Sequence, residues 1–298
     1  MRTLKRLIND FLIKISGYRI VKYKAYEQMY DRSASSIPYD YSVRAFCIQS
    51  IFDFFPRWVS RFEINNAVYG GPSDYRTIRI SMLNEEALYE LVDFTEKTVL
   101  EVGPLEGGNT IILERLHARK ITAVEGHLEN YIRCCVIKNL AGLNKTTFYF
   151  DDAMNLAPEK YGTFDVALIV GLLYHLDRPH LFLNQLGRMA SQLLISTHFA
   201  DDESPSHDAE IQEITFGSST YRGKLFREGI TDPNSGLQQF SFWPFKQDLL
   251  RMLQDAGYGQ VHTIRELTDQ PTKYKLIYLV AEKVDSPVLF SKAGGRAA

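Results

Sequence analysis

The stretch that decides the fold spans residues 98–110 and reads TVLEVGPLEGGNT. An apolar run ends in an acid, turns through glycines and continues into residues 111–115, whose composition is typical of a helix. Gly103 and Gly107 permit a sharp turn and let a ligand lie against bare backbone, while a helix start offers N–H groups without helical partners. The stretch predicts a strand, a turn and a helix that hold a nucleotide-like ligand.

The spacing of the glycines narrows the kind of ligand. A dinucleotide fingerprint needs a glycine where this chain has Leu105, and the Gly-Lys-Ser/Thr of a phosphate-binding P-loop is absent as well. The pattern that remains is Glu101-x-Gly103-x-x-x-Gly107. It matches neither of these two phosphate-binding patterns.

Three later segments continue the alternation of strands and helices. Residues 121–125 (ITAVE) predict a second strand that ends in Glu125, about 20 residues after the glycine turn, where nucleoside-binding sheets place a carboxylate for the ribose hydroxyls. Residues 146–153 (TTFYFDDA) predict a third strand that closes on paired acids. Residues 164–179 (FDVALIVGLLYHLDRP) predict a fourth strand and the turn after it. All four ends are expected at one edge of the sheet, where open α/β sheets bind ligands.

Together the four segments resemble, in order, the motifs of the class I S-adenosylmethionine (SAM) methyltransferases. The resemblance implies a doubly wound, mostly parallel, seven-stranded Rossmann-like α/β sheet with SAM as its cofactor. It also implies that the acid and glycines of the first motif hold the amino-acid end of SAM, that Glu125 holds the ribose and that the third strand end meets the adenine. The candidate cofactor-binding residues are Glu101, Gly103, Gly107, Glu125, Gly126, Asp151, Asp152, Ala153, Val170 and Gly171.

Within that family, the chain looks closest to two groups. Residues 151–153, 171–175 and the Phe-Trp-Pro of 242–244 resemble methyltransferases of bacterial glycan or natural-product clusters, and also the tRNA wobble-uridine carboxymethyltransferase, which uses carboxy-SAM. The chain lacks a recognisable match to the C-terminal arginine-bearing region of the tRNA enzyme. Its sequence pI near 6.4 and net charge of −2 give no overall electrostatic reason to expect nucleic-acid binding.

Cysteine usage indicates the compartment. Cys47 and the adjacent Cys134 and Cys135 form neither a disulfide framework nor a metal-ligand spacing, so a reducing, cytoplasmic location and no bound metal are expected. A metal-dependent variant would need Asp201 and Asp202 together with nearby histidines. No segment approaches the length of a membrane span.

The ends of the chain predict accessory elements. Residues 1–20 predict a basic amphipathic helix. Its first 15 residues would either contact an anionic membrane surface or pack on their own domain or on a second subunit. The last alternative would make the protein a homo-oligomer. The whole of residues 1–82 is expected to form a helical or irregular, tyrosine-rich cap over the substrate. Residues 286–298 are expected to form a flexible tail.

The SAM-binding domain is expected over residues 83–285. Residues 200–240 form a polar insertion within it, interpreted as a substrate lid. Residues 193–199 predict a fifth strand, and residues 261–264 and 275–280 a final hairpin-like pair. A helix is predicted over 127–143, ending near Gly142, with an inward face of Leu128, Tyr131, Ile132, Cys135, Val136 and Leu140.

The expected chemistry is transfer of a sulfonium-activated methyl group to a nucleophile held in line. A hydroxyl acceptor also needs a base, because it is a poor nucleophile while protonated. His175 and His198 follow strand ends at the ligand edge and imidazole titrates near neutrality, so both are candidates, with Tyr174 as a third. Either histidine could instead be structural.

The sequence therefore favours a SAM-dependent O-methyltransferase acting on a small molecule or glycan intermediate. The first alternative is a tRNA wobble-uridine alkyltransferase that uses SAM or carboxy-SAM. The second, from a class without enzymatic activity, is a catalytically silent SAM-binding scaffold. The sequence does not identify the acceptor or the methylated atom.

Overall fold

The computed structural model describes residues 48–55, 57–74, 91–204, 211–229, 232, 234–268 and 272–284. The chain divides into two compact units, residues 1–54 and 55–298. In the first unit the described element is helix α4 (Ile48–Phe54), where Gln49 Nε2 donates to Asp53 Oδ1 at 2.7 Å across one helical turn. The amphipathic helix predicted for residues 1–20, its membrane contact and the tail at 286–298 lie outside the described residues.

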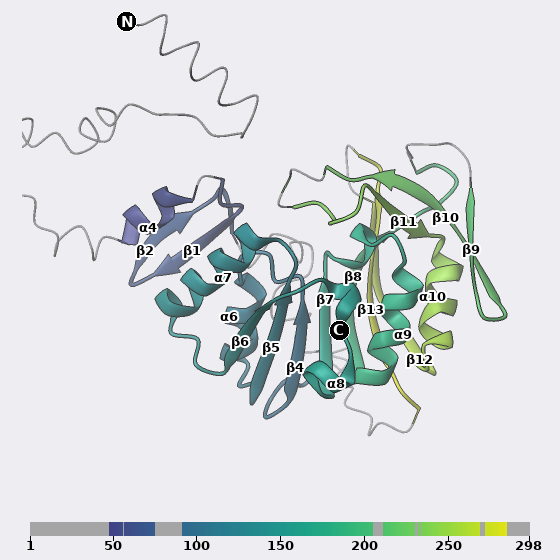
Figure 1. The fold of residues 1–298 in the computed structure, drawn as a ribbon, viewed down its shortest axis with the longest axis horizontal. Coiled ribbons are helices and arrows are strands. Elements are labelled where there is room, and N and C mark those ends of the chain that lie inside the picture. Colours follow the sequence, from purple (N-terminus) through teal and green to yellow (C-terminus); the bar gives the residue numbers. More distant parts are fainter. Residues whose placement is uncertain are drawn as a thin grey trace, which may run out of the picture. The chain divides into compact units, whose positions relative to one another are not determined.

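A seven-stranded sheet organises the second unit (Figure 1), and it confirms the predicted fold class. Its strands stand in the order β12-β13-β8-β7-β4-β5-β6. Five neighbouring strands pair in parallel: β8, β7, β4, β5 and β6. Strand β13 is antiparallel to both of its neighbours, β8 and β12. The strands are β4 (Thr98–Val102), β5 (Lys120–Glu125), β6 (Thr146–Phe150), β7 (Phe164–Val170), β8 (Ala190–Phe199), β12 (Gln260–Thr268) and β13 (Lys275–Glu282).

The central strands read as continuous apolar runs because both faces of a parallel sheet are covered. Every residue of β7 except Asp165 is buried, and Asp165 Oδ2 accepts hydrogen bonds from the backbone N–H (2.7 Å) and hydroxyl (2.8 Å) of Thr98 at the start of β4. The final pair β12 and β13 forms the hairpin-like end predicted from the sequence.

Helices follow the strands in alternation, as the resemblance implies. Pro179 occupies the first turn of α9, where its missing N–H costs nothing, and Gly142 ends α7 in a left-handed conformation (φ 69°) as predicted. The helices and short 3₁₀ turns are α6 (Gly108–Arg115), α7 (Leu128–Ala141), η1 (Ala153–Asn155), α8 (Pro158–Tyr161), η2 (Leu173–His175), α9 (Pro179–Met189) and α10 (Lys246–Asp255). No helix in the described part of the chain has the length and apolar character needed to cross a membrane.

Two small sheets accompany the main one. The first consists of β1 (Ser60–Ile64), β2 (Ala67–Gly70) and β3 (Ser73–Asp74), within the range where the sequence favours helical or irregular chain. The second consists of β9 (Gln212–Phe216) and β10 (Ser219–Arg227), which lie in the insertion, and β11 (Phe240–Pro244), which begins at its last residue; all pair antiparallel. The insertion therefore contributes two strands to a folded sheet.

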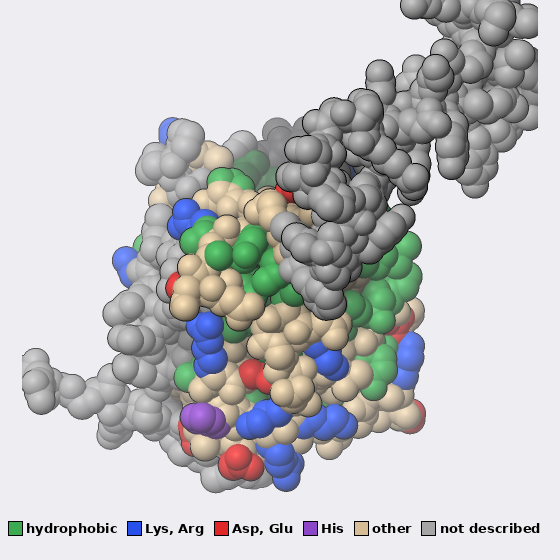
Figure 2. Space-filling view, turned by 90° about the vertical axis from the view of Figure 1, so that its left-hand side faces the viewer, with side chains coloured by type: hydrophobic (Ala, Val, Ile, Leu, Met, Phe, Trp, Pro, Cys, Tyr) green, Lys and Arg blue, Asp and Glu red, His purple; other side chains and the backbone are tan. Residues whose placement is uncertain are grey.

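The predicted inward face of α7 is wrong. Leu128 and Ile132 are 55% and 37% exposed. Hydrophobic side chains also gather on the face of the molecule drawn in Figure 2. The buried positions recur instead at helical spacing as Asn130, Arg133, Cys134 and Ile137. The prediction fails because hydrophobicity ranks a buried arginine as a surface residue, whereas this arginine is paired with a buried acid.

That acid is Glu106, which lies in the glycine turn and is fully buried. Its two carboxylate oxygens accept hydrogen bonds from the backbone N–H groups of Val59 (3.0 Å) and Ser60 (2.6 Å) at the start of β1. The guanidinium of Arg133 lies 3.6 Å from the same carboxylate and 5.4 Å from the centre of the Trp58 ring. One side chain therefore joins the small sheet, the glycine turn and α7.

Replacing Arg133 with Met is expected to lower the free energy of unfolding by about 3–5 kcal/mol, because it leaves Glu106 buried without its cation. Urea unfolding followed by circular dichroism measures the change. The matched control is Arg188→Met in α9, whose ion pair with Glu159 is exposed on both sides (60% and 73%) and which should change stability little. Equal losses in the two variants would contradict a special role for the buried pair.

Candidate cofactor pocket

The glycine turn after β4 has the backbone shape that the sequence predicts. Gly103 and Gly107 both have positive φ, 72° and 83°, which non-glycine residues rarely adopt. The Gly103 N–H donates to the carbonyl of Val124 in β5 at 2.9 Å, which fixes the turn against the neighbouring strand. Gly107 precedes α6, so the turn leads directly into a helix N-terminus.

Glu101 lies beneath this turn and is buried. The Thr110 hydroxyl donates to its Oε2 at 2.5 Å, while Oε1 has no hydrogen-bond partner among the described residues. Burial raises the pKa of Glu101 to about 7; the Thr110 hydrogen bond opposes this shift and the nearby Glu125 adds to it. Glu101 does not line the pocket described below.

Glu125 ends β5 and does line the pocket. Its carboxylate is held by two backbone donors, the N–H of Leu105 at 3.0 Å and the N–H of His127 at 2.8 Å. Burial raises the pKa of Glu125 to about 7, against the opposing effect of His127 and these hydrogen bonds. A carboxylate fixed in this way presents its remaining lone pairs to a hydroxyl-bearing ligand.

The paired acids after β6 have different surroundings. Asp152 lines the pocket and accepts from the backbone N–H of Met154 at 2.8 Å, which caps η1. Asp151 does not line it, since its carboxylate binds the ammonium of Lys160 and the hydroxyl of Tyr161 (2.5 Å). Burial alone would raise the pKa of Asp151, but these hydrogen bonds outweigh burial and hold the pKa well below its usual range.

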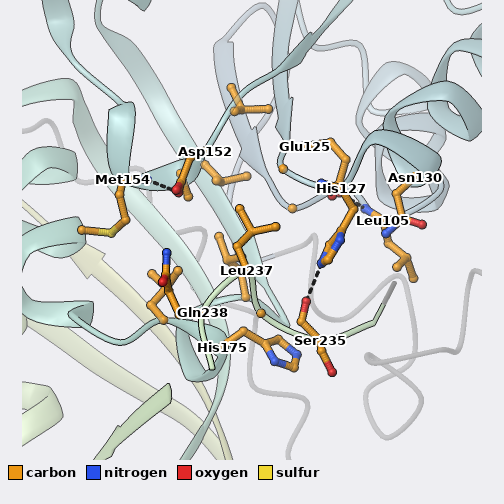
Figure 3. A pocket seen from close by; sticks show the side chains of 18 of the residues that line it. Leu105, Glu125, His127, Asn130, Asp152, Met154, His175, Ser235, Leu237 and Gln238 are labelled. Carbon is orange, nitrogen blue, oxygen red and sulfur yellow. Dashed lines mark hydrogen bonds between the residues drawn. The ribbon is translucent and has the colours of Figure 1, made fainter. Parts of the chain in front are cut away.

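The insertion contributes one wall through residues 234–238. The backbone carbonyl of Ser235 lies 2.7 Å from Nε2 of His127, at the start of α7. Leu237 covers Gly126, since a Cβ on that glycine would lie 2.8 Å from the Leu237 side chain. Figure 3 shows Leu237 between Asp152 and Met154 on one side and His127 on the other.

The resulting pocket encloses about 710 Å³ of space between protein atoms, including its mouth toward solvent. Its lining comes from the carboxyl ends of β4, β5 and β7, from η1 and η2, and from the insertion. The predicted cofactor residues that line it are Gly103, Glu125, Gly126, Asp152, Ala153 and Gly171. Glu101, Gly107, Asp151 and Val170 support the surrounding strands and turns without lining it.

The three candidate bases separate in the structure. His175 lines the pocket, and its Nδ1 lies 2.9 Å from Oε2 of Glu228 in the insertion. Tyr174 and His198 belong to an aromatic cluster with Trp243, whose ring stacks on that of His198 with centroids 5.0 Å apart. The Nδ1 of His198 lies 3.0 Å from the carbonyl of Lys275. The structure therefore brings one of the three candidates to the pocket.

Several lining residues have no counterpart among the sequence-based candidates. They are Val102, Leu105, Val124, His127, Asn130, Met154, Leu172, Leu176, Asp177 and residues 234–238. Most of them adjoin a predicted motif and could have been included by widening each motif by two residues. Residues 234–238 and Glu228 carry no such signal, because the sequence places them in the insertion without showing where it folds back.

Comparison with solved structures gives a consistent result. The chain is similar to the N-terminal domain of EvdMO1 in the presence of SAH and D-fucose (TM-score 0.64, 27% identity, 79% of this chain and 95% of that one). The same domain with SAH bound gives a TM-score of 0.64 at 26% identity over the same shares of both chains. EvdMO1 as a longer chain matches with a TM-score of 0.56 at 23% identity, over 79% of this chain and 47% of that one.

Comparisons with family models and with curated proteins give no match to this sequence. The order of the sheet and the likeness to a domain solved with SAH bound agree with the resemblance of the sequence motifs. This chain therefore has the fold of the class I SAM-dependent methyltransferases, and it is similar to a domain of such an enzyme that was solved with SAH bound.

Proposed function

We propose that this chain binds SAM in the pocket between β4, β5 and η2 and transfers its methyl group to a hydroxyl of a sugar-containing acceptor. The observation that carries the proposal is the arrangement at Glu125, whose carboxylate lines the pocket at the end of β5 and is held there by two backbone N–H groups. This is where nucleoside-binding sheets hold the ribose hydroxyls.

The other pocket residues fit the same ligand. A Cβ on Gly103 would lie 3.3 Å from the Leu172 side chain, which is a tight contact, and the positive φ of 72° disfavours any residue with a side chain at this turn. Asp152 and Gly126 border the pocket where the adenine and ribose of the cofactor would lie. Glu101 lies beneath the turn and not in the lining, so its carboxylate would attract the cationic cofactor without touching it. When bound, SAM supplies a methyl group activated by a positively charged sulfur.

His175 is the proposed general base. Its imidazole would take the hydroxyl proton as the acceptor oxygen receives the methyl group that bound SAM would supply, with the electron pair of the broken carbon–sulfur bond left on sulfur. His198 is the weaker candidate because its ring is stacked within the aromatic cluster. Positioning of acceptor and donor supplies most of the remaining rate enhancement.

A sugar acceptor is supported by the similar EvdMO1 domain, whose crystal structure was obtained in the presence of D-fucose. The chemistry of the pocket suits a neutral, hydroxyl-bearing ligand, since the described lining includes three carboxylates, Glu125, Asp152 and Asp177, and no lysine or arginine. A tRNA acceptor is not supported by this lining, because proteins bind the phosphates of nucleic acids mainly through lysine and arginine side chains.

Calorimetry with SAM and SAH tests the pocket. Gly103→Leu should abolish measurable binding, because the side chain would fill the turn and strain a positive φ. The matched control is Gly142→Leu, which imposes the same strain at φ 69°; apart from its chain neighbours, no described residue lies within 4 Å of the new Cβ, and Gly142 does not line the pocket. Undiminished affinity in Gly103→Leu would remove the pocket assignment.

SAM affinity should rise as the pH increases from 5.5 to 8. Burial raises the pKa of Glu101 and of Glu125 to about 7, so both carboxyls lose their protons over this interval and gain charge that attracts a cationic ligand. The expected gain is about tenfold, the effect of one charge-assisted hydrogen bond. Glu125→Gln should reduce the pH dependence, leaving the part due to Glu101, and a flat profile in the unmodified protein would contradict the role of these carboxyls.

Replacing His175 with Asn should reduce the rate of methyl transfer by about 10²–10⁴-fold while SAM affinity stays unchanged. SAH formation is measured with a panel of free 6-deoxyhexoses, nucleotide-linked sugars and unmodified tRNA, with SAM or carboxy-SAM as donor. Transfer to a sugar that needs His175 supports the proposal. Transfer to tRNA alone, or SAM binding with no transfer to any acceptor, would instead favour the tRNA enzyme or the silent scaffold.

A further inference from the structure

Glu228 and His175 meet across the insertion, although 53 positions separate them in the chain. His175 ends η2 next to the pocket, and Glu228 follows the last residue of β10. Their side chains are only 16% and 7% exposed, and Oε2 of Glu228 lies 2.9 Å from Nδ1 of His175. An ion pair or hydrogen bond at this depth is screened little by solvent.

The same carboxylate oxygen also accepts a hydrogen bond from the wall of the pocket that residues 234–238 form. The backbone N–H of Gly236 donates to Oε2 of Glu228 at 2.7 Å, so Glu228 fixes residues 234–238 and His175 together. Gly236 packs so closely on η2 that a Cβ there would lie 2.3 Å from the backbone carbonyl of His175. Burial would raise the pKa of Glu228, but the hydrogen bond from His175 and the one from Gly236 outweigh burial and lower it. The carboxylate is therefore ionised at neutral pH and can only accept.

An acceptor at Nδ1 decides where the imidazole carries its proton. Because ionised Glu228 has no proton to give, Nδ1 of neutral His175 must be the donor, and the lone pair is left on Nε2. The Nε2 atom is buried and has no hydrogen-bond partner among the described residues. That is the atom and the protonation state that removal of a hydroxyl proton requires.

We infer that Glu228 is a positioning residue for methyl transfer: it holds His175 in the Nδ1–H tautomer and stabilises the imidazolium that forms when Nε2 takes the acceptor proton. The inference rests on the proposed function, in which His175 is the base. Glu228 does not line the pocket and acts through His175. The proton balance is complete, since the proton lost by the hydroxyl resides on Nε2 and leaves to solvent after the products do.

Other ionisable groups around His175 do not take this role. Those that line the same pocket are Glu125, His127, Asp152 and Asp177. The carboxylates of Glu125 and Asp152 accept hydrogen bonds from backbone N–H groups two residues further along the chain. The ring of His127 contacts the Ser235 carbonyl. Asp177 binds the guanidinium of Arg178 at 3.2 Å. Among the described residues, Glu228 is the carboxylate in contact with the His175 ring.

Two variants separate the charge of Glu228 from its hydrogen bond. Glu228→Gln keeps an oxygen that can accept from both His175 and Gly236 but removes the negative charge. Glu228→Met keeps the approximate volume and removes the acceptor. The control is Glu213→Gln, an exposed carboxylate of β9 in the same small sheet.

The first readout needs neither SAM nor an acceptor. Two-bond ¹H–¹⁵N correlation spectra of the imidazoles at pH 8 distinguish the two neutral tautomers, and the His175 signals are assigned by their loss in His175→Asn. We expect Nδ1–H in the unmodified protein, in Glu228→Gln and in the control. Glu228→Met should populate the Nε2–H form. An Nε2–H ring in the unmodified protein, or an unchanged ring in Glu228→Met, would overturn the inference.

The second readout is the pH dependence of kcat/KM with an acceptor found by the panel. Glu228→Gln should lower the rate about tenfold and move the acid limb of the profile to lower pH, because the protonated imidazole loses its counter-charge, and Glu228→Met should lower the rate about 10²–10³-fold. SAM affinity should stay the same in Glu228→Gln, which keeps the acceptor for Gly236, and rates in the double variant Glu228→Met/His175→Asn should match His175→Asn alone.

The two readouts distinguish the two proposals. Loss of rate in Glu228→Gln without any shift of the acid limb would indicate a structural role and overturn the inference. Failure of the unmodified protein to bind SAM would overturn the proposed function instead, and the tautomer spectra would still report whether Glu228 orients His175.

Discussion

The buried carboxylate of Glu106 is the interaction on which the pocket depends. Burying one charge costs several kcal/mol unless donors surround it, and here two backbone N–H groups and the guanidinium of Arg133 do so. The donors come from the start of β1 and from α7, while Glu106 itself lies between the two positive-φ glycines. Satisfying this one charge fixes the turn that borders the cofactor pocket.

A second set of polar contacts closes the opposite wall. The insertion contributes two strands to a small antiparallel sheet that returns to the ligand edge, where the N–H of Phe242 donates to the carbonyl of Leu176 at 2.9 Å and Glu228 binds His175. Backbone packing at Gly236 leaves no room for a side chain. The wall is therefore built from hydrogen bonds between segments far apart in sequence, and it carries the residue that orients the proposed base.

Local patterns were sufficient for the framework and for part of the site. Apolar runs that end in acids located β4, β5, β6 and β7, and the sheet order confirms the fold class that their resemblance implies. The carboxyl-edge rule brought Glu125, Asp152 and His175 to one pocket, because parallel strands end together. The same rule could not separate Asp151 from its neighbour, since Lys160 and Tyr161 draw that carboxylate away through contacts made only on folding.

The sequence by itself determined the doubly wound sheet, the glycine turn and the acid that follows β5, because each depends on residues within one strand–turn–helix unit. Only the tertiary structure decided which face of α7 is buried, which histidine reaches the pocket and what completes its wall. Those outcomes depend on charge pairs between distant segments, Arg133 with Glu106 and His175 with Glu228. A buried charge is stable only beside its partner, and which residues become partners is settled by the packing of the whole domain.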